Sequence, residues 1–338
     1  MKRGWAAAGV AMGLLAGCRH RAYPHWDTPA PMHRPEQIEG LNSPFDDFNS
    51  AQSPRMENGI VFSTNRGSRG HDFDFYGAAL DWDHDGRDMM PSHFHVTQEP
   101  RPVLTDLRSD ANERGPIFIL PDDNWPKGYE TFAFASDRPG GQGGLDLYST
   151  VCTRPVSYFW RWWEDMGCDV AENLRPMGVN SASDDAYVTR PFEHRHVLFS
   201  SNRPRPLHAD TNHHLHDALW DAGQSIQDAP RASAPVEMLN SDADDDAPFV
   251  YDTSYGPKRE VVFVSSREGG LGEHDLYCAR YDENGWSAPV HLVQYSSPRD
   301  EYRPIVIEMG ARFLLFSSTR EGGQGGYDLY IVGYDGCP

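Results

Sequence analysis

Positive charge and long apolar runs are both scarce in this sequence. Its 338 residues include 30 Lys and Arg against 50 Asp and Glu, which gives a formal net charge of −20. A surface of that charge repels phosphate backbones, so we expect no nucleic acid partner. The one marked apolar stretch, residues 5–16, is shorter than the roughly 20 residues that a membrane-spanning helix needs.

Common catalytic signatures are missing as well. The chain has no nucleophile elbow, phosphate-binding loop or dinucleotide fingerprint, and no His-Glu-x-x-His spacing of the kind found in zinc enzymes. An enzyme should also show acids or bases that are not part of a repeated phrase, and the one such cluster in this chain is the histidine-rich region at 194–217. The sequence therefore favours a protein without enzymatic activity.

The apolar stretch itself indicates export. It follows two basic residues and ends in Leu-Ala-Gly-Cys, with the cysteine at position 18. This resembles a secretory signal peptide that ends in a lipobox, which implies cleavage before Cys18 and lipidation of its thiol. We therefore expect a signal peptide at 1–17, a tether at 18–25 and a domain at 26–338 held to the membrane by lipid. Arg19 after the cysteine favours the outer membrane of the cell envelope, by resemblance to enterobacterial sorting rules.

Four cysteines remain after Cys18, and an exported chain can oxidise them. Cys152 and Cys168 flank a short excursion, so we expect a disulfide between them. Cys278 and Cys337 either pair across two repeats or stay free.

A short phrase occurs five times: Phe-x-Ser/Thr-x-Arg, a glycine-rich or polar bridge, and then Asp-x-Tyr or a relative of it. Eight residues separate Arg from Asp in four copies and 14 in the third copy, which therefore carries an insertion. The arginines are Arg66, Arg138, Arg203, Arg267 and Arg320. The aspartates are Asp74, Asp146, Asp217, Asp275 and Asp328.

A second phrase, Ser-x-x-Asp/Asn-Asp/Glu, precedes each copy. Its serines are Ser43, Ser109, Ser181, Ser241 and Ser297. Short β-branched and aromatic runs bounded by Gly and Pro predict strands, and the glycine-rich bridges predict tight reversals between them. Successive arginines lie 53 to 72 residues apart, which suits a four-stranded propeller blade.

These phrases resemble the TolB-type, WD-like propeller repeat of bacterial envelope proteins over residues 41–335. The resemblance implies one all-β propeller of four-stranded antiparallel blades. Five blades are favoured, with six or seven if a degenerate blade is present. The last repeat ends too early to supply its own fourth strand, so we expect residues 26–38 to close the ring.

A residue needed in every blade is structural, because chemistry is ordinarily done once per chain. We therefore expect the five arginines to brace the blades through charge-assisted hydrogen bonds to the repeated carboxylates.

Two clusters could bind a metal ion. Asp81, Asp83 and Asp85 resemble the start of a calcium loop, although the bidentate Glu of such a loop is missing. The third repeat is rich in imidazoles, which suit a transition metal or form an ordinary polar loop. Its histidines are His194, His196, His208, His213, His214 and His216. No cofactor other than Ca²⁺ is expected.

The densest aromatic patch, residues 158–163, lies in the irregular third repeat. It is either a core plug or an exposed contact with a protein or glycan. We expect a partner to bind within residues 158–220. The candidate contact residues are Trp160, Trp162, Trp163, His213 and His214.

Two classes of function remain. The favoured one, implied by the TolB-type resemblance, is a non-enzymatic lipoprotein whose propeller is an interaction platform for an envelope protein. The alternative is a secreted propeller enzyme or glycan-binding protein that acts through the central channel or the histidine-rich third blade.

Overall fold

The structure is a computed structural model of the whole chain. The residues that it describes are 32–52, 58–84, 91–119, 129–153, 167–168, 175–189, 196–205, 211–219, 233–252, 259–309 and 311–338. The expected signal peptide, Cys18, the tether, Asp85 and the tryptophans at 160, 162 and 163 lie outside these ranges. No helix in the described ranges has the length and apolarity needed to cross a bilayer.

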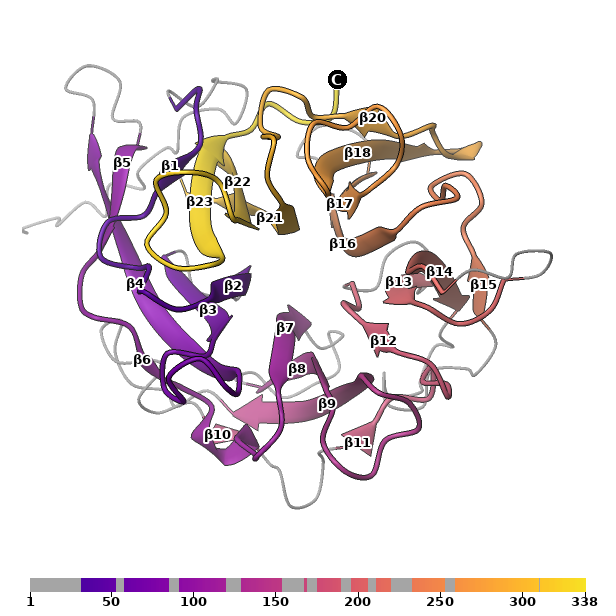
Figure 1. Cartoon of the computed structure of the whole chain (residues 1–338), viewed down its shortest axis with the longest axis horizontal. Coiled ribbons are helices and arrows are strands. Elements are labelled where there is room, and N and C mark those ends of the chain that lie inside the picture. The colour runs from indigo at the N-terminus through magenta and orange to yellow at the C-terminus, as the bar shows by residue number, and fades with distance from the viewer. Residues whose placement is uncertain are drawn as a thin grey trace, which may run out of the picture.

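Five antiparallel sheets are arranged around a common centre (Figure 1). This confirms the prediction of a five-bladed all-β propeller. The first blade contains β2 (Asp47–Gln52), β3 (Gly59–Thr64), β4 (Asp74–His84), β5 (Pro91–Val96) and β6 (Arg101–Pro102). A single turn of 3₁₀ helix, Thr105–Leu107, connects it to the second blade.

The second and third blades carry the longest connections. The second contains β7 (Glu113–Ile119), β8 (Tyr129–Ser136), β9 (Asp146–Thr153), β10 (Gly167–Cys168) and β11 (Arg175–Pro176). The third contains β12 (Asp185–Ala186), β13 (His196–Ser201), β14 (His214–Leu219) and β15 (Ser233–Pro235).

The fourth and fifth blades are the most regular. The fourth contains β16 (Asp245–Asp252), β17 (Arg259–Ser265), β18 (Asp275–Asp282), β19 (Gly285–Trp286) and β20 (Val290–His291). The fifth contains β21 (Glu301–Glu308), β22 (Arg312–Ser318) and β23 (Asp328–Gly333), and its fourth strand is β1 (Glu36–Gln37).

The N-terminal segment closes the ring, as predicted. Glu36 pairs with Ile331 and Gln37 with Tyr330 in an antiparallel ladder. Joining the two ends of the chain in one sheet gives the last blade its fourth strand and closes the ring.

Glycines of the bridges allow adjacent blades to approach closely. A Cβ added to Gly143 would lie 1.9 Å from the carbonyl oxygen of Ser183 in the next blade. A Cβ on Gly325 would lie 1.9 Å from the carbonyl oxygen of Phe45 in the first blade. The glycine-rich bridge is thus a contact between blades as well as a turn.

Candidate functional site

The five repeated arginines, which we call the blade arginines, bind the second acid of the upstream phrase in their own repeat. The Nη2 atom of Arg66 lies 2.6 Å from Asp47, that of Arg138 lies 2.8 Å from Glu113, and that of Arg320 lies 2.9 Å from Glu301. Arg203 and Arg267 make the same ion pair with Asp185 and Asp245.

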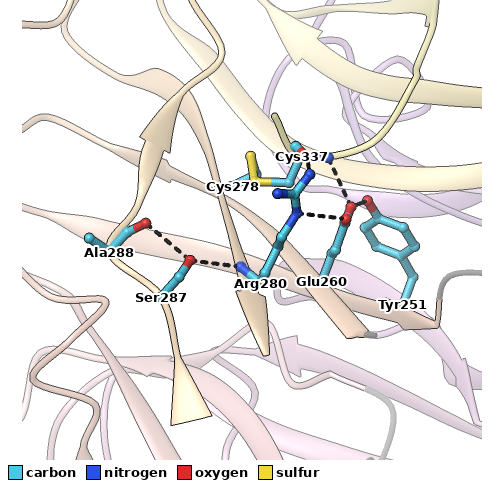
Figure 2. The surroundings of a disulfide bond; sticks show 7 residues. All are labelled: Tyr251, Glu260, Cys278, Arg280, Ser287, Ala288 and Cys337. Carbon is cyan, nitrogen blue, oxygen red and sulfur yellow. Dashed lines mark hydrogen bonds and ion pairs between the residues drawn. A yellow bond between two sulfur atoms is a disulfide. The ribbon is translucent and has the colours of Figure 1, made fainter. Parts of the chain in front are cut away.

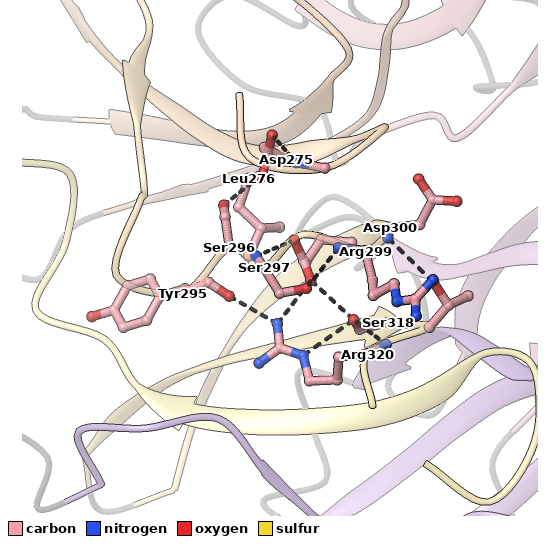
Figure 3. A network of polar contacts seen from close by, with 12 residues as sticks. Asp275, Leu276, Tyr295, Ser296, Ser297, Arg299, Asp300, Ser318 and Arg320 are labelled. Atoms are coloured by element: carbon pink, nitrogen blue, oxygen red, sulfur yellow. Dashed lines mark hydrogen bonds and ion pairs between the residues drawn. The ribbon is translucent and has the colours of Figure 1, made fainter. Parts of the chain in front are cut away.

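Each blade arginine has further partners that fix its geometry. Arg320 donates to Ser318 Oγ at 3.1 Å and to the Tyr295 carbonyl at 2.9 Å, as Figure 3 shows. Its guanidinium also lies 4.9 Å from the ring centroids of Phe316 and Tyr330. The pairing acid Glu301 is fully buried, so this network has the geometry of a structural ion pair.

The aspartates of the Asp-x-Tyr phrase have a different role. Asp146 accepts hydrogen bonds from the backbone N–H groups of Gln142 and Gly143 at 2.9 and 3.0 Å. Asp328 accepts the equivalent bonds from Gln324 and Gly325. These carboxylates hold the glycine-rich bridges.

Two further aspartates belong to the same column. Asp275 accepts bridge hydrogen bonds from Leu271 and Gly272, while Asp74 pairs with Arg108 at 2.9 Å. None of the four aspartates that keep this column is paired with its blade arginine in the described structure.

The assignment of Asp217 to this column requires correction. His214 pairs with Ser201, where the other repeats place their aspartate opposite Ser or Thr, and His216 lies opposite Phe199, in the place of the tyrosine. Asp217 instead binds Nδ1 of His196 at 2.7 Å. The sequence pattern misled because an unrelated aspartate follows the true position by three residues.

Two histidines of the third blade, His214 and His216, lie in its interior. His214 and His216 are 0% and 2% exposed, so neither is available to a protein partner in the folded ring. Burial, reinforced by the charge of Arg203, lowers the pKa of His216 to about 3. His216 is therefore neutral at physiological pH and packs on the Phe199 ring, 5.8 Å between centroids.

The aspartates of the calcium hypothesis lie on the ribbon formed by β4 and β5. Asp81 and Asp83 are exposed there and face His95 and His93 in the ladder. Across the described residues, no three His, Cys, Asp or Glu side chains are grouped to hold a metal ion.

Two disulfides are present. Cys152 and Cys168 join β9 to β10, and Cys278 pairs with Cys337 across two repeats. Figure 2 shows the second bridge beside Glu260, which accepts a hydrogen bond from the Cys337 N–H at 2.9 Å. This bridge fixes the C-terminal segment to the fourth blade.

The first strands of the blades, β2, β7, β12, β16 and β21, lie nearest the centre of the ring (Figure 1). Each begins at the acid that pairs with the blade arginine, and the second residue after that acid has a positive φ. These residues are Asn49, Gly115, Tyr187, Ala247 and Arg303. The backbone is repeated here, but the side chains are not.

Side chains from all five blades converge around Tyr187 at the centre. Asn49 Nδ2 lies 3.4 Å from the Tyr187 hydroxyl, and the Arg303 guanidinium lies 5.3 Å from its ring centroid. Gly115 has to be glycine, because a Cβ there would lie 2.5 Å from the Tyr187 ring. The ring of Tyr302 packs edge-on against it, 5.7 Å between centroids.

Asp246 of the fourth blade completes this group. It accepts hydrogen bonds from the Tyr302 hydroxyl and, at 2.7 Å, from the Ala247 N–H. Burial raises the pKa of Tyr302 well above its usual value, so the hydroxyl stays protonated and donates to the carboxylate. The charge of Arg114 in the second blade acts on the Tyr187 hydroxyl as well. We call the group the axial cluster; it comprises Asn49, Arg114, Tyr187, Asp246, Tyr302 and Arg303.

Aromatic side chains surround the end of the axis where the inner strands begin. The N–H of Tyr327 donates to Asp46 at 3.0 Å, which places Tyr327 against the start of β2 in the next blade. The same bond joins His274 to Asp300 and Phe73 to Asn112. The residue before each Asp-x-Tyr phrase therefore lies at this end of the ring.

These aromatic residues pack on one another. Phe48 contacts Phe73 and Tyr327 with centroid distances of 4.6 and 5.9 Å, and Tyr302 contacts Tyr327 and His274 at 6.2 and 6.1 Å. We call Phe48, Phe73, His274 and Tyr327 the aromatic collar. His274, Tyr302 and Tyr327 are partly exposed, so solvent reaches the collar.

The end of the axis with the collar carries cationic groups beside the carboxylates of Asp46, Asp246 and Asp300. Burial lowers the pKa of Arg303 to about 10, which leaves it charged at neutral pH. Burial alone would lower the pKa of His213, but its hydrogen bond to Asp244 and the charge of Asp246 outweigh this and raise it to about 9. Arg303 and His213 thus bring positive charge close to Asp246 in a protein that is acidic as a whole.

Sequence comparison identifies no relative: no protein-family model and no curated protein matches the chain. Solved structures do match. A thermostable family-43 glycoside hydrolase is 8% identical with a TM-score of 0.54, over 89% of this chain and 91% of that one. A levansucrase variant of B. subtilis is 9% identical with a TM-score of 0.52, over 89% of this chain and 86% of that one.

These comparisons overturn the expectation of a non-enzymatic interaction platform. Both similar structures are enzymes by name. The earlier expectation depended on the absence of unrepeated acids and bases from the repeat phrases. The axial cluster lies outside those phrases, because its unrepeated residues directly follow the repeated acids.

Proposed function

We propose that the chain is a carbohydrate-acting propeller enzyme whose site is the aromatic collar and the axial cluster beneath it. The observation that carries the proposal is the convergence of unrepeated polar side chains from five blades on one point of a repeated scaffold. Regular positions stabilise such a scaffold, whereas positions free of the repeat can serve chemistry. The fold it shares with a glycoside hydrolase supports the same proposal.

The collar suits a sugar. Binding sites for small molecules combine aromatic walls with a few fixed polar groups. Here the buried rings of Phe48 and Phe73 pack behind the collar. The partly exposed His274, Tyr302 and Tyr327 combine ring faces with polar atoms. A saccharide, with apolar C–H faces and hydroxyl groups at its edges, matches both features.

Asp246 and Asp300 are the carboxylates that we assign to the reaction. Glycoside hydrolysis commonly uses a pair of carboxyl groups that flank the bond to be broken. Asp246 is held by the Tyr302 hydroxyl, and Asp300 accepts from the Tyr327 hydroxyl at 3.3 Å. Because Tyr302 packs on Tyr327, the two carboxylates border the same aromatic surface.

The test is release of reducing sugar from a panel of oligosaccharides by the full mature chain. Asp246→Asn is expected to lower the rate by about 10²- to 10⁴-fold, the usual contribution of a general acid or base. Asp252→Asn, at the exposed end of the same strand β16, is the matched control and should leave the rate unchanged. Equal rates for wild type and Asp246→Asn would contradict the proposal.

Asp300 offers a second matched pair. The second blade has Asn112 in the equivalent position, so asparagine is compatible with the contact between blades. We expect Asp300→Asn to reduce sugar release, and Asp184→Asn, the same change at the third blade, to leave it unaltered. Thermal unfolding of both variants checks that the ring is intact.

We also propose that the mature protein is anchored through a lipid on Cys18, and that its blades are TolB-type repeats. The lipobox-like end of the apolar stretch supports the first proposal, and the recurrence of Phe-x-Ser-x-Arg and Asp-Leu-Tyr supports the second. Replacing Cys18 with Ala should abolish acyl labelling and release the exported chain from the membrane fraction. Unchanged labelling would refute the anchor.

A further inference from the structure

Arg303 is a buried cation whose donors are mostly unused. Its side chain is 0% exposed, and its Nη1 atom donates to the Pro248 carbonyl at 2.8 Å. The Nε and Nη2 atoms have no hydrogen-bond partner among the described residues. A native structure rarely leaves buried donors in this state without a reason in function or ligand binding.

Arg114, which is partly exposed, also has a buried guanidinium donor without a hydrogen-bond partner among the described residues. Its guanidinium lies over the rings of Phe73 and Phe48, with centroid distances of 4.7 and 5.8 Å, and its buried Nε atom has no partner in the described part of the chain. No carboxylate forms an ion pair with Arg114 or Arg303 in the described structure. We call these two residues the axial arginines.

Both axial arginines interact with Tyr187. Arg303 lies over the Tyr187 ring, and the charge of Arg114 acts on the Tyr187 hydroxyl against the burial that raises its pKa. Asp246 is the one carboxylate of the axial cluster, and its oxygens are occupied by Tyr302 and Ala247. Within the axial cluster, two guanidinium groups therefore accompany one carboxylate.

We propose that the site selects saccharides that carry an anionic group, which Arg114 and Arg303 bind. This inference rests on the function proposed above. A guanidinium presents paired N–H donors that match a carboxylate, sulfate or phosphate. The Arg114 side chain, partly exposed beside the collar, makes the first contact, and Arg303 lies beneath it. The acidic surface elsewhere disfavours polyanions, so this recognition is confined to the axis.

The experiment is titration calorimetry of the full mature chain with three probes at low and high salt. They are an oligosaccharide of uronic acids, a neutral oligosaccharide of the same length and linkage, and inorganic phosphate. We expect the acidic oligosaccharide to bind at least tenfold more tightly than the neutral one, with affinity that falls as salt rises. Arg114→Gln should weaken acidic binding by about 10- to 100-fold, the range for a hydrogen bond to a charged group.

Arg299→Gln is the control, because Arg299 is an exposed arginine whose partner Glu321 is also exposed. It should leave every affinity unchanged. Equal binding of acidic and neutral oligosaccharides, or no effect of Arg114→Gln, would overturn the inference while leaving the proposed function intact. If phosphate binds in an Arg114-dependent way but neither oligosaccharide does, the anion site is real and the proposed carbohydrate function fails.

Discussion

The blade arginines and the axial arginines place the same guanidinium in opposite chemical settings. Arg138 has a carboxylate at 2.8 Å, a serine hydroxyl at 3.1 Å and a carbonyl at 2.7 Å, whereas Arg303 has one carbonyl and no ion pair in the described structure. The first setting recurs in every blade and the second does not. A fully satisfied charge stabilises a scaffold, while an unsatisfied one is tolerated where a ligand binds.

The largest change in stability is expected when a blade arginine is replaced. Arg267→Met leaves the Asp245 carboxylate, which is 0% exposed, without its cation. Removing one partner of a buried pair typically costs about 3–5 kcal/mol, so we expect a loss of that size in the free energy of unfolding. Chemical denaturation measures it. A loss below about 1 kcal/mol would place the pair among weak surface contacts.

The pH dependence of stability tests the same setting in the second blade. Burial outweighs Ser109 and Arg138 and raises the pKa of Glu113 from 4.5 to about 7. The folded state therefore holds this proton more tightly than the unfolded state does. The resulting stability is complete below pH 4.5 and is lost as pH rises through about 7, by up to about 3 kcal/mol.

Denaturation at several pH values, with Glu113→Gln as control, isolates this contribution. The variant cannot titrate at position 113, so its stability should fall less between pH 5 and 8 than that of the wild type. The same slope in both proteins would show that another group is responsible.

A smaller effect separates the axis from the bridges. Gly115 and Gly140 both have positive φ, but a Cβ on Gly115 would meet Tyr187 at 2.5 Å and one on Gly140 would meet nothing within 4 Å. Gly115→Ala should therefore be less stable than Gly140→Ala by about 1–3 kcal/mol, the cost of overpacking. Thermal unfolding of the pair measures the difference, and equal values would mean that Tyr187 moves aside freely.

The two settings also differ in how far sequence could predict them. Repetition exposed the blades, their number and the closing segment, because each depends on backbone features that every copy needs. The residues of the axial cluster occupy the two positions after the repeated acids, but neither position keeps one residue type across the blades. A search for repeated phrases therefore passes over Arg114, Asp246 and Arg303. Their meeting depends on ring closure, which brings together residues up to 254 positions apart, from Asn49 to Arg303.

In the third blade, the search for repeats assigned a residue to the wrong position instead of missing one. Repetition led to Asp217, whereas strand pairing places His214 and His216 in the aspartate and tyrosine positions. His216 can fill the tyrosine position because its ring packs on Phe199 as tyrosine does on phenylalanine elsewhere. Residue identity alone could not reveal this, since the match is one of shape and not of charge.

Replacing an axial arginine should change stability least, and it should raise the free energy of unfolding where the loss of a blade arginine lowers it. Arg303→Met removes a buried charge that has no ion pair in the described structure, at the cost of one hydrogen bond to Pro248 and the contact with the Tyr187 ring. Because desolvating an unpaired charge costs more than these contacts return, we expect the free energy of unfolding to rise by about 1 kcal/mol. The same Arg-to-Met change at Arg267 should lower it. If both variants lose stability equally, then Arg303 is balanced by its neighbours, and the contrast between the two settings is one of position alone.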